Sequence, residues 1–199
     1  MHDDFVAEMR RRWTLRFGRG VAGALSPGAI VKVVGRVRAE AAPRNSPLGG
    51  RESVLYTVRG SRAEGSGKNR RVIVFADEEW FVPFWVEREK GRVRIEPEAW
   101  FRLLAERRVI ANSATTAANL DAFAARYGLH ERDFFDGFGG ASYVERSISP
   151  GDIVAVIGTV HDTGMVAEGG YRESQPVYAL RPPANGRLWI SSLAPHIKR

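Results

Sequence analysis

A twelve-residue phrase that occurs twice constrains the fold of this chain more than any other feature. The phrase SPGAIVKVVGRV, at residues 26–37, returns as SPGDIVAVIGTV at residues 149–160, with eight of the twelve positions identical. Each copy opens with a Pro-Gly turn and continues in β-branched residues, which is typical of a strand. This internal similarity predicts two related strands placed symmetrically in one barrel.

Glycines inside both predicted strands favour a small barrel. Gly35 and Gly158 occupy equivalent positions in the two copies, and a glycine within a strand usually marks a bulge or a sharp bend. Small barrels need such bends where their strands turn corners. The sequence therefore predicts a barrel of the oligonucleotide/oligosaccharide-binding (OB) type, over roughly residues 26–97 and 142–190.

Further strands are expected between and after the two copies. Alternating apolar residues predict strands at residues 51–60 and 71–75, a hairpin formed by residues 81–87 and 92–96, and closing strands at residues 176–182 and 187–193. The acidic cluster of Asp77, Glu78 and Glu79 is expected on a solvated turn.

Helical patterns account for the rest of the chain. Residues 98–111 and 115–129 each read as a helix, the second with Gly128 at its carboxyl end, and together they predict a two-helix insertion over residues 98–141. An amphipathic helix is expected within residues 1–20. The predicted fold class is α+β and mainly β, with residues 26–199 forming a single domain that contains the small OB-like barrel and its insertion.

The predicted N-terminal helix is a candidate interaction surface. Its apolar residues recur at every fourth position, and arginines lie to the sides of this stripe; the surface comprises Phe5, Met9, Arg10, Arg11, Arg12, Trp13 and Phe17. A basic helix with Phe and Trp on its apolar face is typical of a membrane-surface anchor. Packing on its own domain or self-association would bury the same four apolar side chains, and we expect one of these in preference to lipid binding.

The positive net charge raises the possibility of a second interaction surface, one that binds an acidic partner. The chain carries a formal charge of +7, and residues 1–71 hold fifteen basic and six acidic residues, so the basicity is an N-terminal property. Such a surface suits nucleic acid, anionic lipid or an acidic protein. A groove that binds single-stranded nucleic acid needs basic and aromatic side chains. The candidates for such a groove are Lys32, Arg36, Arg38, Arg51, Arg59, Tyr56, Phe75, Phe84 and Trp85.

No catalytic or metal-binding constellation is visible in the sequence. The chain has no cysteine, and its four histidines, at positions 2, 130, 161 and 196, lack a second ligand at helical or hairpin spacing. The GSGK stretch at residues 65–68 fails as a phosphate-binding loop because Arg62 and Asn69 stand where that loop needs Gly and Ser or Thr. We therefore expect a non-enzyme without cofactor or metal. With no signal peptide and no membrane-spanning stretch, the expected location is the cytoplasm, with peripheral contact at a membrane as an alternative.

Four phrases in order resemble the GIDE domain, also called the beside-a-membrane domain, of mitochondrial ubiquitin ligase activators and their bacterial relatives. GRVRAEA is followed by NSPLGGRESVLYTVRG, similar to the family's SPL-(T/S)-G-(R/K)-x-C-x-x-Y-x-V stretch. DEEWFVPFWVEREKGRVRIEPE is similar to PF-x-L-x-D-x-x-G-x-V-x-V-x-P, and LDAFAARYGL with YVERSISPGDIVAVIGTV is similar to E-x-x-I-x-P-G-D-x-V-x-V-x-G. The resemblance runs from about residue 30 to residue 160.

The resemblance implies a module rather than an enzyme. Members typically have membrane helices beside the domain, and the mitochondrial ligases end in a RING, which binds zinc through cysteines; this chain has neither, and Ser53 stands where the family often has Cys. We therefore expect no ubiquitin-transferase activity of the RING type from these residues. We expect a non-catalytic GIDE-like interaction module with a protein partner or a second copy of itself, and we keep a nucleic-acid-binding OB-type barrel as the alternative.

Overall fold

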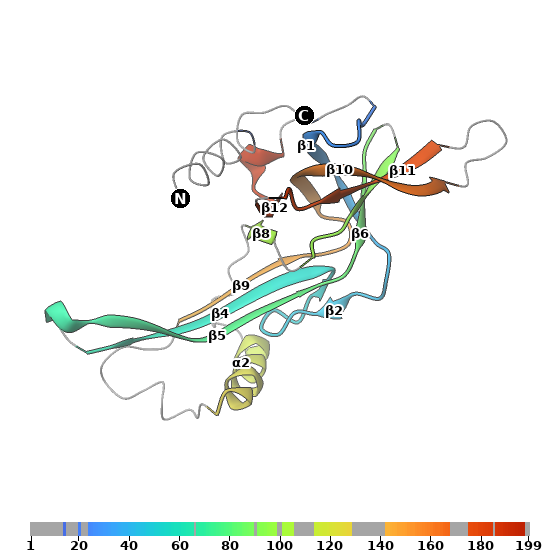
Figure 1. The fold of residues 1–199 in the computed structure, drawn as a ribbon. Helices are drawn as coiled ribbons and strands as arrows, with labels where there is room; N and C mark the ends of the chain where they lie inside the picture. The colour runs from blue at the N-terminus through green and yellow to red at the C-terminus, as the bar shows by residue number, and fades with distance from the viewer. Residues whose placement is uncertain are drawn as a thin grey trace.

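Strands dominate the computed structural model, which describes residues 14, 20, 24–65, 67–89, 91–98, 101–105, 114–128, 142–167, 175–184 and 186–197. The fold is α+β and mainly β, as the sequence predicts (Figure 1). The described strands are β1 (Ile30–Ala39), β2 (Arg44–Asn45), β3 (Glu52–Ser53), β4 (Leu55–Glu64), β5 (Arg71–Phe81), β6 (Phe84–Glu87), β7 (Arg92–Ile95), β8 (Phe101–Leu104), β9 (Ser142–Ile148), β10 (Ile153–Ala167), β11 (Gln175–Arg181) and β12 (Leu188–Ser191). The described helices are α2 (Ala114–Arg126) and the short 3-10 turns η1 (Gly67–Asn69) and η2 (Ala194–His196).

Five strands of the main sheet are linked in a circuit of hydrogen-bonded neighbours. The sheet has seven strands in the order β1-β6-β7-β11-β10-β12-β8, and β1 pairs with β10 as well as with β6. The circuit β1-β6-β7-β11-β10 is antiparallel at every step except β7–β11, which is parallel. Outside the circuit, β12 pairs with β10, and β8 extends the sheet as a parallel neighbour of β12.

The two copies of the repeated phrase pair with each other. Both are strands, as predicted, and Val33 of β1 lies opposite its own equivalent, Val156 of β10. The backbone contacts at the two ends match: Gly28 N–H donates to the carbonyl of Val160 at 2.8 Å, and Gly151 N–H donates to the carbonyl of Val37 at 2.9 Å. The two phrases are therefore related by a local two-fold axis through the centre of the β1–β10 pair.

Gly35 allows β1 to pair with two neighbouring strands, β10 and β6. Arg36, the next residue, lies opposite Ile153 of β10 and also opposite Glu87 of β6, so the strand changes partner at this point. A Cβ atom at Gly35 would lie 2.0 Å from the carbonyl oxygen of Glu87. Only glycine permits this close approach of two backbones.

The main core lies between the circuit and the strands beside it. On β1 the side chains of Val33 and Val37 point into this core, because residues two apart share a face of a strand. A second core lies between α2 and the three-stranded sheet β5-β4-β9, where Phe123 of the helix packs against Tyr56 and Val58 of β4. Figure 1 shows α2 beside this smaller sheet, whose β4–β5 hairpin extends away from the main sheet.

Two local predictions are wrong, and one lies outside the described residues. Phe101–Leu104, predicted as helix, form β8, because their alternating burial fits a strand beside β12. The acidic residues 77–79 lie within β5 rather than on a turn, opposite residues 57–59 of β4. The helix α2 confirms the second of the two predicted helices over the described residues, whereas residues 106–113 and 129–141 of the predicted insertion lie outside them. The predicted helix of residues 1–20 stays a prediction, since only Thr14 and Gly20 of that stretch are described.

Candidate interaction surface

The outer surface of β6, β7 and β11 carries aromatic and charged side chains close together. Alternation on β6 turns Phe84 and Val86 into the core and leaves Trp85 on the outside, and β7 likewise exposes Arg92 and Arg94. We call the surface formed by Trp85, Arg92, Arg94, Glu96 and Arg181, together with Glu40 at the end of β1, the arginine face.

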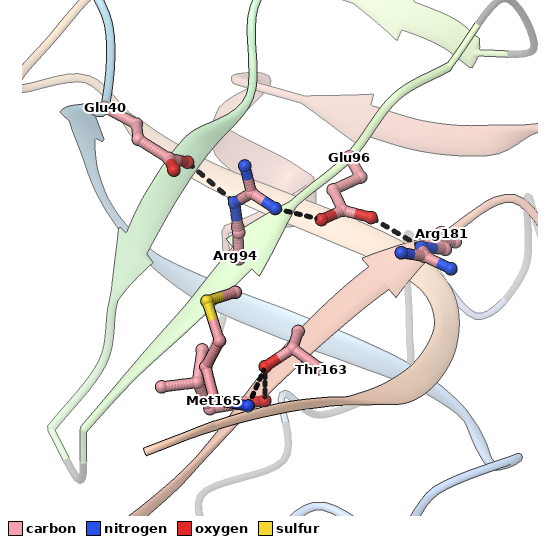
Figure 2. A network of polar contacts seen from close by, with 7 residues as sticks. Glu40, Arg94, Glu96, Thr163, Met165 and Arg181 are labelled. Carbon is pink, nitrogen blue, oxygen red and sulfur yellow. Dashed lines mark hydrogen bonds and ion pairs between the residues drawn. The ribbon is translucent and has the colours of Figure 1, made fainter. Parts of the chain in front are cut away.

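Figure 2 shows the polar chain at the centre of this face. Arg94 Nε donates to Glu40 at 2.8 Å, and a second nitrogen of the same guanidinium donates to Glu96. Arg181 Nε donates to the other oxygen of Glu96 at 2.5 Å. Glu96 therefore bridges an arginine of β7 and an arginine of β11, and the chain joins the parallel pair of strands to the end of β1.

The row of interacting side chains, formed by Glu40, Arg94, Glu96 and Arg181, is partly shielded from water and balanced in charge. The side chain of Glu96 is 13% exposed, and that of Arg94 is 22% exposed. The hydrogen bond to Glu40 raises the pKa of Arg94, which keeps the guanidinium charged. Two arginines and two glutamates hold one another in fixed positions, so the centre of the face presents oriented charges rather than a net positive potential.

A tryptophan and an apolar hairpin border the polar chain. The guanidinium carbon of Arg92 lies 4.3 Å from the centroid of the half-buried Trp85 ring, a cation–π contact. On the other side, Met165 and Val166 of β10 are exposed, where the register between β10 and β11 shifts after Asp162, and Figure 2 shows the Met165 side chain pointing toward Arg94. In the same irregular segment, Thr163 Oγ1 donates to the carbonyl of Val177 at 2.6 Å.

A second polar cluster is closed to solvent. Glu145 of β9 is 2% exposed, and its carboxylate accepts hydrogen bonds from the Ser46 hydroxyl at 2.8 Å, from Leu48 N–H at 2.7 Å and from Gly49 N–H at 3.1 Å. These donors line the turn between β2 and β3. Glu145 thus positions that turn against β9 and is not open to a ligand. Sequence reasoning missed it, because no strand was predicted over residues 142–148 and nothing local to Glu145 indicates that it will be buried.

The residues predicted for a single-strand groove do not share a surface. Phe84 and Tyr56 are buried in different cores, and Phe75 packs against the second core. Lys32 is buried as well, and loss of hydration lowers its pKa. Three of the arginines form ion pairs, Arg38 with Glu87, Arg51 with Asp152 and Arg59 with Asp77, and Arg36 donates to the carbonyl of Gly151. Trp85 alone of the four predicted aromatics lies on the arginine face.

The predicted surface of the N-terminal helix lies outside the described residues. This applies to Phe5, Met9, Arg10, Arg11, Arg12, Trp13 and Phe17. Within the described ranges, no helix has the length and apolarity needed to cross a membrane.

A serine–histidine pair near the end of the chain has a structural role. Ser191 Oγ lies 2.7 Å from Nδ1 of His196, and the same oxygen accepts a hydrogen bond from Leu193 N–H at 3.2 Å. Because Ser191 is fully buried and both contacts are local, the pair fixes the turn that leads into η2. The part of the chain that the structure describes contains no group of three or more side chains suited to hold a metal ion.

Neither a family model nor a curated protein nor a solved structure matches this chain significantly.

Proposed function

We propose that this chain is a non-catalytic, GIDE-like interaction module, built on a five-stranded OB-type barrel, that docks a protein partner on its arginine face. The observation that carries the proposal is the Arg94–Glu96–Arg181 chain, in which charges are fixed on the outside of the strands where OB barrels take their ligands.

The strand pairings support the barrel. An OB barrel has five strands in a Greek-key arrangement, and the circuit β1-β6-β7-β11-β10 links five strands with a single parallel pair, β7–β11. By chain order β6 and β7 are the second and third strands of this circuit, and Met165 lies in the fourth, β10. In OB barrels the second and third strands contribute to the ligand face, so the part of the arginine face on β6 and β7 lies where a ligand is expected.

Contacts between the family-like phrases support the GIDE resemblance. The phrase that begins at Ser46 and the phrase that contains Glu145 are far apart in sequence, yet they meet through the buried Glu145 carboxylate. In the third phrase, Phe84 and Ile95 are core residues, and Gly91 has a positive φ of 81° at the hairpin turn. The shared letters Ser46, Glu145, Phe84 and Gly91 thus have structural roles, which is consistent with a module and does not indicate a reaction.

The pairing of charges favours a protein partner over nucleic acid. A phosphate-binding groove needs cations that are free to replace counterions. On the arginine face Arg94 and Arg181 already share Glu96, and nearby Arg38 is paired with Glu87 at 2.8 Å. A protein surface with a complementary pattern of donors and acceptors, and an aromatic or aliphatic group for Trp85 and Met165, fits this arrangement better.

Site-specific photo-crosslinking tests the proposal. A photoreactive residue replaces Trp85 in the full chain, expressed in its native host, and a matched chain carries it at Asp121, which is exposed on α2. We expect a discrete protein adduct from position 85 that is absent from position 121 and is lost when Arg94→Gln is added. Equal adducts from both positions, or no adduct from position 85, would contradict docking on this face.

The Trp85–Arg92 contact also favours the alternative, a nucleic-acid-binding barrel, because single-stranded bases stack on such platforms. Fluorescent single-stranded oligonucleotides, titrated at low and at high salt, separate the two functions. The proposal expects no binding at low salt. Binding that weakens steeply as salt rises, and that Trp85→Ala reduces, would replace the proposed function with this alternative.

The N-terminal helix remains a proposed second contact. If Phe5 and Trp13 dock on the domain or on another copy, deleting residues 1–17 lowers the melting temperature or changes the assembly state. An unchanged melting temperature and assembly state, together with the loss of binding to anionic vesicles, would instead assign this segment to a membrane surface.

A further inference from the structure

The outer edge of β5 is an exposed strand edge. In the three-stranded sheet β5-β4-β9, β5 pairs with β4, and no described strand pairs with its other side. Three apolar residues in a row lie exposed on it: Val72 is 70% exposed, Ile73 37% and Val74 44%. An exposed strand edge with consecutive apolar side chains is a template for pairing with another strand.

The charges along this strand are arranged in opposite blocks. Arg70 and Arg71 precede the apolar segment 72–74, and Asp77 and Glu79 follow it. Antiparallel pairing of this strand with a second copy, about a two-fold axis through the apolar segment, brings the basic end of each copy beside the acidic end of the other. The strand is therefore complementary to itself in charge as well as in hydrophobicity.

The acidic end has capacity for additional cations. Glu78 is already engaged, since it accepts a hydrogen bond from Tyr127 at 2.7 Å and lies 3.3 Å from Arg126. Asp77 pairs with Arg59 at an exposed position. The pKa of Glu79 is raised by loss of hydration and then by the neighbouring charge of Asp77, and the charges of Arg187 and Arg59 offset this only in part. An arginine supplied by a second copy would relieve the remaining repulsion.

We propose that the β5 edge is a self-association surface, on which a second copy of this chain pairs antiparallel, segment 72–74 against segment 72–74. In this register Arg70 of each copy lies opposite Ala76 of the other, so the basic end formed by Arg70 and Arg71 lies beside the acidic end that begins at Asp77. This surface lies on a different sheet from the arginine face, and the proposal does not depend on the function proposed above.

The geometry limits the strength of this contact. Phe75 is passed over in the β4–β5 register, between the Gly60–Ala76 and Ser61–Val74 pairs, and a bulge of this kind interrupts a ladder. The paired segment is therefore short, and its interface falls in the small, transient class. We expect a monomer–dimer equilibrium that shifts with protein concentration, with a dissociation constant on the order of tens of micromolar.

Sedimentation velocity of the full chain over a range of concentrations tests the proposal. Two charge-reversed variants are compared, Arg70→Glu/Arg71→Glu and Asp77→Lys/Glu79→Lys. Each brings like-charged ends side by side in a homodimer, so each is expected to weaken self-association about tenfold or more. Mixed in equal amounts, the two variants restore opposite charges at both ends, and the mixture is expected to dimerise as well as the wild type.

Matched controls separate charge from folding. Glu52→Lys/Glu89→Lys changes the net charge as much as the acidic-end variant does, at exposed positions outside β4 and β5, and should dimerise like the wild type. Circular dichroism verifies that all variants are folded. A wild type that stays monomeric at every concentration, variants that dimerise unchanged, or a mixture that does not associate would overturn the proposal. So would binding of the wild-type monomer to anionic vesicles through Arg70 and Arg71, which would assign this edge to a lipid surface.

Discussion

Removing the charge of Glu145 is expected to destabilise the whole domain, because this carboxylate connects β9 to the turn between β2 and β3. Glu145→Gln keeps the shape but turns an amide N–H₂ group toward the Ser46, Leu48 and Gly49 donors, which now contact the carboxylate at 2.7–3.1 Å. A hydrogen bond to a charged group contributes about 1.5–3 kcal/mol, and a buried donor left without an acceptor costs about 1–3 kcal/mol. One lost charged bond and one unpaired donor amount to about 3 kcal/mol.

Urea denaturation, monitored by tryptophan fluorescence, measures this loss as a lower midpoint at an unchanged slope. For a chain of this size the same loss lowers Tm by roughly 6–12 °C. Ser46→Ala, which removes one donor and leaves the carboxylate its backbone bonds, should cost about 1 kcal/mol. Glu52→Gln, at an exposed position, should change the free energy of unfolding by less than about 0.5 kcal/mol. If Glu145→Gln were no more destabilising than Glu52→Gln, the role assigned to the buried carboxylate would be refuted.

Three further outcomes follow from contacts described above. Gly35→Ala forces a Cβ atom to within 2.0 Å of the Glu87 carbonyl oxygen, so it should cost more than about 3 kcal/mol in urea denaturation, or abolish folding, and a tolerated alanine would argue against the close approach of β1 to β6. Loss of hydration and the hydrogen bond to Glu78 raise the pKa of Tyr127 from 10.0 to about 12. The stability from this group is therefore complete below pH 10 and is lost as the pH rises toward 12, so Tyr127→Phe should flatten the alkaline decline in Tm, and an unchanged decline would contradict this assignment. Phe123→Ala removes the centre of the second core and should cost about 3–5 kcal/mol by the same denaturation assay, whereas a cost below about 1 kcal/mol would show that α2 does not depend on this contact.

The strands of the circuit were accessible to sequence reasoning because local signals and tertiary pairing agree there. The two SPG phrases combine a turn signal with β-branched residues, and the structure pairs them directly. The β6–β7 hairpin was predicted from alternation, with Gly91 at its turn. The closing strands β11 and β12 were also found, although only the structure shows that β11 runs parallel to β7.

The errors arose where a distant partner overrides local preference. Phe101–Leu104 are good helix formers, and four residues fit helical and strand periodicity equally well; the parallel contact with β12 decides the outcome. Residues 77–79 have low strand propensity, but cross-strand pairing with β4, including the Arg59–Asp77 ion pair, keeps them in β5.

The candidate surface was the least predictable part. Arg94, Glu96 and Arg181 were visible as charged residues, but their meeting depends on the parallel β7–β11 register. A charged side chain next to a strand gives no local sign of which distant residue it will contact. Trp85 was the one member named from the sequence, as part of the predicted single-strand groove, and alternation on its strand places it on the face opposite the buried Phe84.

The local two-fold axis between β1 and β10 makes folding depend on parts of the chain that are synthesised far apart in time. Each SPG turn is held by a carbonyl of the other copy, Gly28 by Val160 and Gly151 by Val37, so neither turn can be completed alone. On the ribosome, β1 emerges long before β10 is synthesised, so its valines stay unpaired until most of the polypeptide has been made. Such long-range closure gives the chain a high contact order, which slows folding and prolongs the exposure of β1 to aggregation or chaperones.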